Sequence, residues 1–183
     1  GIDSARQWVA DDNSGFFRST DGGATWTFVV SEWHPIASSR SRTATLFALT
    51  LTSTSFAQSF GVSTDGGTSF VTKIQGAAKS AGLGPLGYGI APGELFVYGS
   101  SGGGRQFHYS NDDGETFMQR FAPPVAAKVI VAAAGSPNAV YVGGSPLNAG
   151  DPQLYRSLDN AITWQPVATF PAPLSDFGGT TGN

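Results

Sequence analysis

Short apolar runs, separated by Gly, Pro, Asn and Asp, follow one another along this chain, and the pattern is clearest in its last third. Residues 129–132 and 139–143 are apolar runs that contain β-branched residues. Apolar and polar residues alternate in 153–157, as in a strand with one face in the core, and a further strand is expected at 163–167. The sequence does not show the apolar spacing of an amphipathic helix. We therefore expect an all-β protein.

An eight-residue motif divides the chain into four units. Its general form is Ser-x-Asp-x-Gly-x-Thr-Trp, and the four copies start at Ser19, Ser63, Ser110 and Ser157. A regular period of this length indicates a repeat architecture, and four short antiparallel strands in about 45 residues are the dimensions of a β-propeller blade. We expect one domain over residues 1–183. Its blades are predicted at about residues 5–30, 42–74, 86–121 and 127–169.

The sequence leaves open whether these blades form a complete ring. The innermost strand is poorly marked in the second unit, and it is missing from the first unless residues 174–177 supply it by the usual ring closure. The alternatives are a small four-bladed ring and a part of a larger ring, completed by further sequence or by another subunit. We favour the larger ring, because the chain starts in mid-blade and ends in the polar residues 178–183.

Each position of the motif has a structural role. The aspartate can accept hydrogen bonds from the N–H groups of its own turn. The glycine supplies a positive φ, and the aromatic residue buries a large ring at the start of the last strand. In the fourth copy Ala161 replaces the glycine, so we expect that turn to be strained or differently shaped. The motif residues are Ser19, Asp21, Gly23, Trp26; Ser63, Asp65, Gly67, Phe70; Ser110, Asp112, Gly114, Phe117; and Ser157, Asp159, Trp164.

The motif resembles the Asp-box, or BNR repeat, of β-propeller proteins, and its four copies cover nearly the whole chain. Proteins with this repeat include sialidases, xyloglucan-degrading glycoside hydrolases, sortilin-type receptors and photosystem assembly factors. Residues 136–143, Ser-Pro-Asn-Ala-Val-Tyr-Val-Gly, look most like the xyloglucanase and assembly-factor branches. In these proteins the box lies on the rim, away from the ligand face. The resemblance therefore implies that the motif aspartates are structural and not catalytic.

Composition narrows the classes of function. Charged residues make up 13% of the chain, about half the usual share, and Ser, Thr, Gly and Ala replace them, which is typical of a secreted protein. We expect an extracellular or periplasmic location. The net charge of -3 without a basic run excludes non-specific nucleic-acid binding, and no apolar stretch approaches the roughly 18 residues of a membrane span. Without cysteine, and with two histidines that lack a third ligand motif, we expect no metal or other cofactor.

Candidate site residues come from the loops between the second and third strands and between blades, which we expect to form one ligand face. Trp33, in a polar connection, is either a platform for stacking on a sugar or a lid over the core, and Tyr88 is either a second platform or a buried strand residue. Glycoside hydrolysis needs two carboxylates, so Asp11 or Asp12 could act with Glu32 or Asp151. The catalytic candidates are Asp11, Asp12, Glu32 and Asp151, and the ligand-binding candidates are Trp33, His34, Arg40, Arg42 and Arg105.

Three functions remain open. The first is a binding or scaffold module for a carbohydrate or a protein, which predicts no close pair of carboxylates. The second is a glycoside hydrolase, or a piece of one, that acts on a β-glucan such as xyloglucan; it predicts two carboxyl groups about 5–10 Å apart in a groove lined by aromatic rings. The third is an assembly subunit whose open blade edges pair with another chain. Sialidase activity is not expected, because the sequence lacks an Arg-Ile-Pro segment and a convincing arginine triad.

Overall fold

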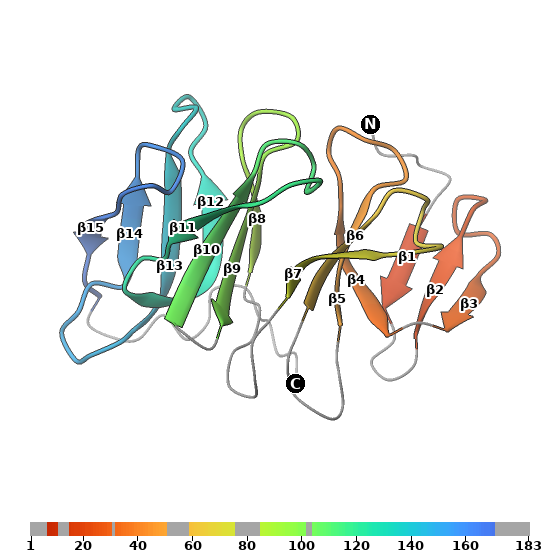
Figure 1. Ribbon diagram of the computed structural model, residues 1–183, viewed down its shortest axis with the longest axis horizontal. Coiled ribbons are helices and arrows are strands. Elements are labelled where there is room, and N and C mark those ends of the chain that lie inside the picture. Colours follow the sequence, from red (N-terminus) through yellow and green to blue (C-terminus); the bar gives the residue numbers. More distant parts are fainter. Residues whose placement is uncertain are drawn as a thin grey trace.

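The computed structural model describes residues 7–10, 15–30, 32–50, 59–75, 85–101 and 104–170. In these ranges the chain forms strands, turns and bends and no helix. The strands make four antiparallel sheets that follow one another in chain order (Figure 1). The first sheet holds β1 (Gln7–Ala10), β2 (Gly15–Ser19) and β3 (Thr27–Val30), and the second holds β4 (Trp33–Ser38), β5 (Leu46–Thr50), β6 (Ser59–Ser63) and β7 (Val71–Gln75). The third holds β8 (Leu86–Tyr88), β9 (Leu95–Ser101), β10 (Gly104–Ser110) and β11 (Met118–Phe121), and the fourth holds β12 (Val125–Ala132), β13 (Val140–Pro146), β14 (Leu154–Ser157) and β15 (Gln165–Ala168).

Each sheet is a simple meander in which every strand pairs with the strand next to it in the chain. This arrangement confirms the all-β fold of β-propeller blades, one per motif. The described part of the first sheet has three strands, and the other sheets have four. The predicted closing strand at residues 174–177 lies outside the described residues.

The second sheet begins earlier than the sequence pattern indicates. Its innermost strand is β4, which pairs with β5 and shifts register between Pro35 and Ala37. Proline has no N–H to give to a ladder, and the shift breaks the alternation of apolar and polar residues that marks a strand. Trp33 and His34 are therefore strand residues, and the prediction that they lie in a loop between blades is wrong.

One aromatic contact recurs between consecutive sheets. It joins the phenylalanine three residues before the motif serine of one sheet to the motif aromatic residue, seven after the serine, of the next sheet. The rings meet edge to face, an arrangement that adds about 0.5–1.5 kcal/mol to the burial of the rings themselves. We call this the seam contact. The three pairs are Phe16 with Phe70 (6.4 Å between centroids, 87° between planes), Phe60 with Phe117 (5.6 Å, 84°) and Phe107 with Trp164 (5.2 Å, 76°).

Buried apolar side chains fill the seams around these contacts. Between the second and third sheets, Phe47, Phe60 and Leu95 belong to one cluster. Between the third and fourth sheets, Phe107 and Val142 belong to another, with Trp164 packed against it. The core therefore lies between the faces of neighbouring sheets, as expected for radial blades. No helix in the described residues could cross a membrane.

The strands have two distinct ends, and these decide which loops can share a site. All four motif turns lie at one end, at the top of Figure 1, together with the turns that join the first and second strands of the later sheets. In the second sheet the two turns are joined by the bond from Gly66 N to Ala44 O, and Asp113 N bonds Gly93 O in the third. We call this the motif end. Among the described residues, the loop between β13 and β14 and the link between β11 and β12 lie at the opposite end.

Candidate functional site

Both carboxylate oxygens of each motif aspartate accept hydrogen bonds from their own turn. In the first copy, Asp21 Oδ1 accepts from Ser19 Oγ at 2.8 Å and from Thr25 N at 2.9 Å, and Asp21 Oδ2 accepts from Thr25 Oγ1 at 2.6 Å. The Ser19 hydroxyl oxygen in turn accepts from Gly23 N at 2.8 Å. The same bonds form around Asp65, Asp112 and Asp159.

These bonds keep the motif aspartates ionised. Bonds from the Thr25 hydroxyl and amide and from the Ser19 hydroxyl lower the pKa of Asp21 from 3.8 to about 2. Burial opposes ionisation of Asp65 and Asp159, but their turn bonds outweigh it and lower each pKa to about 2. The pKa of Asp112 is also lowered, again against the effect of burial. A general acid in glycoside hydrolysis must carry a proton, so these four carboxylates are unsuited to that role.

The fourth motif keeps the shape of the others despite its alanine. Ala161 has a φ of 65°, beside values of 86° for Gly67 and 79° for Gly114 at the same position. A left-handed backbone costs a non-glycine residue about 1–2 kcal/mol. The turn is therefore strained and not differently shaped, and the Ala161 side chain is buried in the seam between the third and fourth sheets.

The residues expected to form one ligand face are divided between the two ends. Glu32 lies between β3 and β4, Arg105 lies at the start of β10 and Asp151 lies between β13 and β14, all at the opposite end. Arg40 and Arg42 lie in the turn between β4 and β5, at the motif end. The expectation that Arg40 and Arg42 converge with the other candidates is therefore wrong. Its cause is the missed strand β4, which makes residues 39–45 a turn within a sheet and not a link between sheets.

Trp33 lies against its own sheet. Its ring stacks on Phe70, with 5.6 Å between the centroids and 20° between the planes. A Cβ placed on Gly61 would come within 2.4 Å of the Trp33 ring, so the glycine provides room for it. His34 is buried beside Trp33 in the same strand. The ring is thus a packing element of the second sheet and not a platform in a polar loop.

The other candidates are not brought into one group. Asp151 accepts bonds from Asn148 N at 3.1 Å and from Asn148 Nδ2 at 2.8 Å, so it shapes its own loop. Glu32 and Arg105 are exposed. Asp11 and Asp12 lie outside the described residues.

Histidine provides no metal centre in the described part of the chain. His108 is buried in β10 and lies edge-on to Phe117, and burial lowers its pKa, so it is neutral. No group of three or more His, Cys, Asp or Glu side chains in the described ranges could hold a metal ion.

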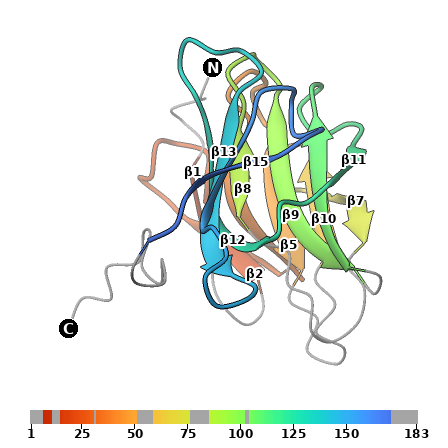
Figure 2. The same ribbon diagram turned by 90° about the vertical axis from the view of Figure 1, so that its left-hand side faces the viewer.

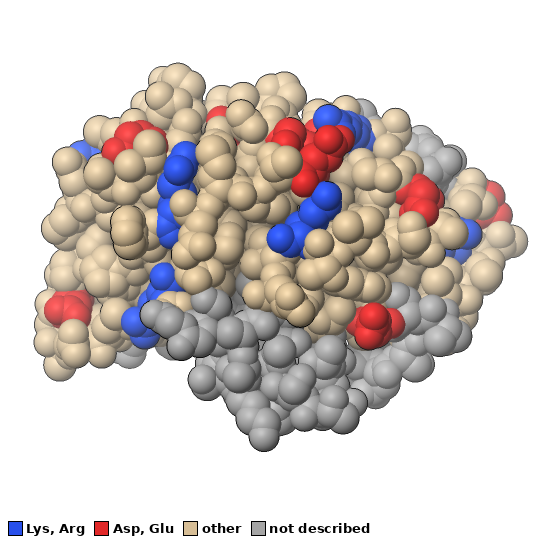
Figure 3. Space-filling model, in the orientation of Figure 1, with Lys and Arg blue, Asp and Glu red and all other residues tan. Residues whose placement is uncertain are grey.

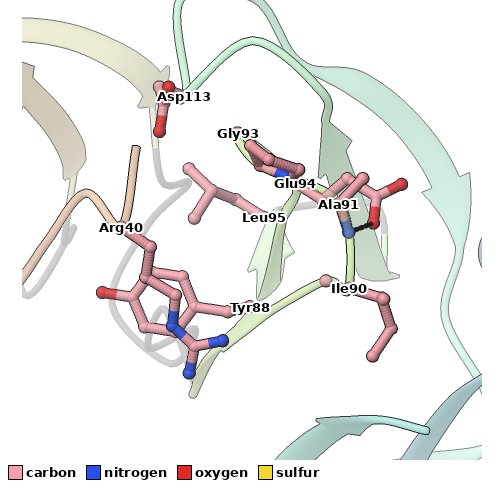
Figure 4. A pocket seen from close by; sticks show the side chains of 10 residues that line it. Arg40, Tyr88, Ile90, Ala91, Gly93, Glu94, Leu95 and Asp113 are labelled. Atoms are coloured by element: carbon pink, nitrogen blue, oxygen red, sulfur yellow. Dashed lines mark hydrogen bonds between the residues drawn. The ribbon is translucent and has the colours of Figure 1, made fainter. Parts of the chain in front are cut away.

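A small pocket of about 150 Å³ opens at the motif end of the seam between the second and third sheets (Figure 4). Arg40, from the second sheet, holds its guanidinium 4.1 Å above the ring of Tyr88 in β8. Tyr88 donates its hydroxyl to Ser38 O at 2.6 Å, and burial raises the pKa of this hydroxyl. Tyr88 is therefore half buried with an arginine over its ring face, which makes it a packing residue of the seam and not an open sugar platform.

Asp113 is the centre of the polar contacts in this seam. Its Oδ1 accepts from Ser39 Oγ and its Oδ2 from Ser41 Oγ, each at 2.5 Å, and Arg42 Nε lies 3.3 Å from Oδ2. All three partners belong to the second sheet, so one carboxylate of the third sheet binds a whole turn of its neighbour.

Further charged contacts reinforce the same seam. Arg42 also pairs with Glu115, and Lys73 donates to Glu115 O at 2.9 Å. In Figure 3 acidic and basic side chains meet at this end of the molecule, over the middle sheets. Asp113 and Glu115 lie within the third motif in the sequence, and their role across the seam depends on sheet packing, which the sequence does not show.

Glu94, the second carboxylate in the pocket, is also held by the fold. Its Oε1 accepts from Tyr109 Oη at 3.0 Å and its Oε2 accepts from Ala91 N at 2.9 Å, the bond dashed in Figure 4. Burial, with the bond to Glu94, raises the pKa of Tyr109 to about 12, so the phenol stays a donor. Two carboxylates beside an aromatic ring are what a glycoside hydrolase site needs. Here, however, each carboxylate oxygen of Glu94 and Asp113 already accepts a hydrogen bond from the protein. The pocket is also smaller than the roughly 300 Å³ of a typical ligand site.

A larger and more apolar groove of about 360 Å³ lies on the outer side of the third and fourth sheets, lined by Gln119, Arg120, Phe121 and Ile162. We call it the outer groove. Phe121 is 86% exposed and Ile162 is 53% exposed. Trp164 Nε1 donates to Phe121 O at 2.8 Å and so fixes the end of β11 against the fourth sheet.

Arg120 brings a cation to the outer groove. Its guanidinium lies 6.0 Å from the centre of the Tyr109 ring. Its Nε is buried and has no hydrogen-bond partner within the described ranges. Neither Arg120 nor Phe121 was predicted as a site residue from the sequence. The only signal was an aromatic residue without a motif role, directly before residues 122–124, and nothing in the sequence shows its exposure.

Comparison with known proteins shows the fold and no family. No protein-family model matches the chain, and no curated protein matches it. Among solved structures, the GH74 xyloglucanase from Xanthomonas campestris is similar with a TM-score of 0.59 and 24% identity, over 91% of this chain and 24% of the xyloglucanase. YCF48 bound to D1 peptide is similar with a TM-score of 0.56 and 13% identity, over 95% of this chain and 53% of YCF48. The GH74 enzyme from Niastella koreensis gives 0.55 and 21%, over 89% of this chain and 22% of the enzyme.

All three are β-propellers, in agreement with the four sheets of this chain. At these identities the likeness concerns the fold alone. The chain spans about a quarter of the length of the two GH74 enzymes and about half of YCF48.

Proposed function

We propose that this chain is a non-catalytic propeller module that binds an extended peptide segment of a partner protein in the outer groove. The observation that carries the proposal is Phe121, a large apolar side chain that is 86% exposed on the wall of a groove. Exposed apolar surface of this kind marks interaction sites, and aromatic residues and arginine are enriched where binding energy concentrates.

The groove selects a peptide by three features. Phe121 and Ile162 offer contact to an apolar side chain. Arg120 lines the groove and brings a positive charge to it, which favours an acidic side chain of the peptide. β11 is the outer strand of its sheet, so an extended segment can lie along its free edge and add main-chain hydrogen bonds.

A peptide fits these observations better than a glycan does. The two aromatic residues foreseen as sugar platforms are engaged in packing, Trp33 with Phe70 and Tyr88 with Arg40. YCF48, which has the same fold, has been solved with a peptide bound, so such a fold is able to hold one. The bonds of the four motif turns further support placing the chain among the Asp-box repeat propellers.

The experiment is a selection of random heptapeptides displayed on phage against the immobilised 183-residue chain. We expect enriched peptides with an apolar residue next to an acidic one. Their synthetic forms should lose about tenfold or more in affinity for Phe121→Ala and Arg120→Ala, measured by fluorescence anisotropy. The control is Val71→Ala, which also truncates an exposed apolar side chain on the outer strand of a sheet, β7 in the second sheet. It should leave the affinity unchanged.

Two results would overturn the proposal. One is a selection without enrichment, and the other is enriched peptides that bind wild type and Phe121→Ala equally. A glycan array probed with the same two proteins separates the alternatives, because glycan binding that Phe121→Ala does not alter would place the function elsewhere.

A further inference from the structure

A seam contact joins the residue three before the motif serine of one sheet to the motif aromatic residue of the next sheet. The first and the fourth sheet of the described row each hold one of these residues without the other. No sheet of the described residues lies on the outer side of the first sheet, and its motif aromatic residue, Trp26, is 41% exposed and makes no ring contact with another described aromatic residue. The fourth sheet has Leu154 three residues before its motif serine, where the other sheets have phenylalanine. No sheet of the described residues lies on the outer side of the fourth sheet either.

A second contact across a seam is unmatched in the same way. Arg18, directly before the first motif serine, donates through its Nη1 to Gly66 O at 3.4 Å and to Thr68 Oγ1 at 3.2 Å, in the motif turn of the next sheet. Arg156 holds the same position in the fourth sheet. Its Nη2 reaches Gln165 Oε1 at 3.3 Å, but its Nε is buried and has no hydrogen-bond partner in the described part of the chain.

The two outer faces that carry these groups are apolar. On the first sheet, Phe17 and Phe28 are both exposed and lie with their ring centroids 5.1 Å apart. On the fourth sheet, Val131, Tyr141 and Arg156 lie opposite one another on neighbouring strands. Tyr155, next to Arg156, is buried in the seam with the third sheet, and successive side chains of a strand alternate. Arg156 and Tyr141 therefore point to the outer side of the sheet, which faces the viewer in Figure 2.

We propose that the outer face of the fourth sheet binds the outer face of the first sheet of a second copy of this chain. In this assembly Leu154 packs on Trp26 of the second copy, as Phe107 packs on Trp164 within the chain. Arg156 donates to the carbonyl of Gly22 of the second copy, because Gly22 holds the position in the first motif that Gly66 holds in the second. The packing of Leu154 thus repeats the seam contact found at all three seams of the chain, and the Arg156 bond repeats the Arg18 bond of the first seam.

Such a contact joins two different surfaces, so it is head-to-tail. Head-to-tail contacts give closed rings where the rotation allows it. Two copies joined at both ends form a ring of eight sheets, four from each copy, within the roughly four to eight blades of known propellers. The outer groove takes no part in this interface, so the inference is independent of the proposed function.

The test is the mass of the particle by size-exclusion chromatography with light scattering, over protein concentrations of about 1–200 µM. We expect the 18.9 kDa chain to associate with rising concentration, to a dimer if the ring closes. Leu154→Asp and Trp26→Asp should each weaken association at least tenfold while the far-ultraviolet circular dichroism is unchanged. The matched control is Leu158→Asp, which makes the same change at an exposed leucine in the motif turn of the same sheet; it should associate like wild type.

Mixing the two defective variants gives the sharper result. One of the two interfaces in a mixed pair then joins an intact Leu154 to an intact Trp26, so the mixture should associate where each variant alone does not. A wild-type chain that stays monomeric over the whole range would overturn the proposal. So would association that survives both substitutions, or a mixture that behaves like the separate variants.

Discussion

A single carboxylate organises each motif turn. One of its oxygens accepts from the hydroxyl of the serine before it and from a backbone N–H after it, and the other accepts from the hydroxyl of the following threonine or serine. The four copies repeat this pattern with almost identical lengths, 2.6 Å for the Thr25 hydroxyl and 2.6 Å for the Thr163 hydroxyl. Each turn is therefore a small electrostatic unit whose stability depends on ionisation of its aspartate.

The first prediction concerns acid. The pKa values of Asp21, Asp65 and Asp159 are about 2 in the folded chain, below the ordinary 3.8. Because folding lowers them, these carboxylates stabilise the native state above pH ~4, and the stabilisation is lost as the pH falls toward about 2. We expect the urea midpoint to decrease over this window. In Asp159→Asn the decrease should be smaller than in wild type; an unchanged pH dependence would show that the turn bonds do not control ionisation.

Asp113 carries the second prediction. Its side chain is 6% exposed and accepts from two serine hydroxyls of the neighbouring sheet, so Asp113→Ala leaves the buried Ser39 hydroxyl without this acceptor, at a cost of about 1–3 kcal/mol. Asp113→Asn is the matched variant: it tolerates the φ of 61° and keeps one acceptor oxygen, so it should lose less. Urea unfolding measures both. An Asp113→Ala protein as stable as wild type would remove the seam role of this residue.

The sequence was sufficient for the motif residues and insufficient for their neighbours. Spacing and residue type alone predicted that Asp21 and its counterparts hold turns, since all of their bonds are local. The role of Asp113 depends on which turn lies across the seam, and that of Glu94 on the Tyr109 hydroxyl of another strand in its own sheet. The role of Phe121 depends on its exposure. None of these properties follows from residues close by in the chain.

At the scale of strands, the short apolar or alternating runs and the turn residues between them predicted most elements. It failed at β4, where Pro35 and the register shift at residues 35–37 interrupt the alternation. That one miss moved Arg40 and Arg42 to the wrong end of the molecule. Residues between two strands lie at one end of the molecule if they form a turn within a sheet and at the other end if they link two sheets. A single missed strand therefore changes the end to which such residues are assigned.

The third prediction compares one substitution on two strands. Phe60 in β6 is fully buried in the seam between the second and third sheets, and Phe121 in β11 is 86% exposed. Phe60→Ala should cost about 3–5 kcal/mol of unfolding free energy, whereas Phe121→Ala should change it by less than about 0.5 kcal/mol. Chemical denaturation of the two variants tests this. A large loss in Phe121→Ala would mean that this side chain packs in solution.

At the scale of the whole molecule, the described chain is a row of four sheets in which the same two positions meet at every seam. A phenylalanine of one sheet packs on the motif aromatic residue of the next, and at the first seam Arg18 adds a hydrogen bond. The two outer faces of the row expose the same chemistry that the seams bury.

The measurement that tests this account most directly is a double-mutant cycle on Phe60 and Phe117, which face each other across the seam between the second and third sheets. Unfolding free energies of wild type, Phe60→Ala, Phe117→Ala and the double variant should give a coupling of about 0.5–1.5 kcal/mol. The same cycle on Phe60 and Trp164, which belong to different seams, should give a coupling near zero. Equal couplings in the two cycles, or none for Phe60 with Phe117, would contradict the packing of consecutive sheets on which the site, the groove and the assembly all depend.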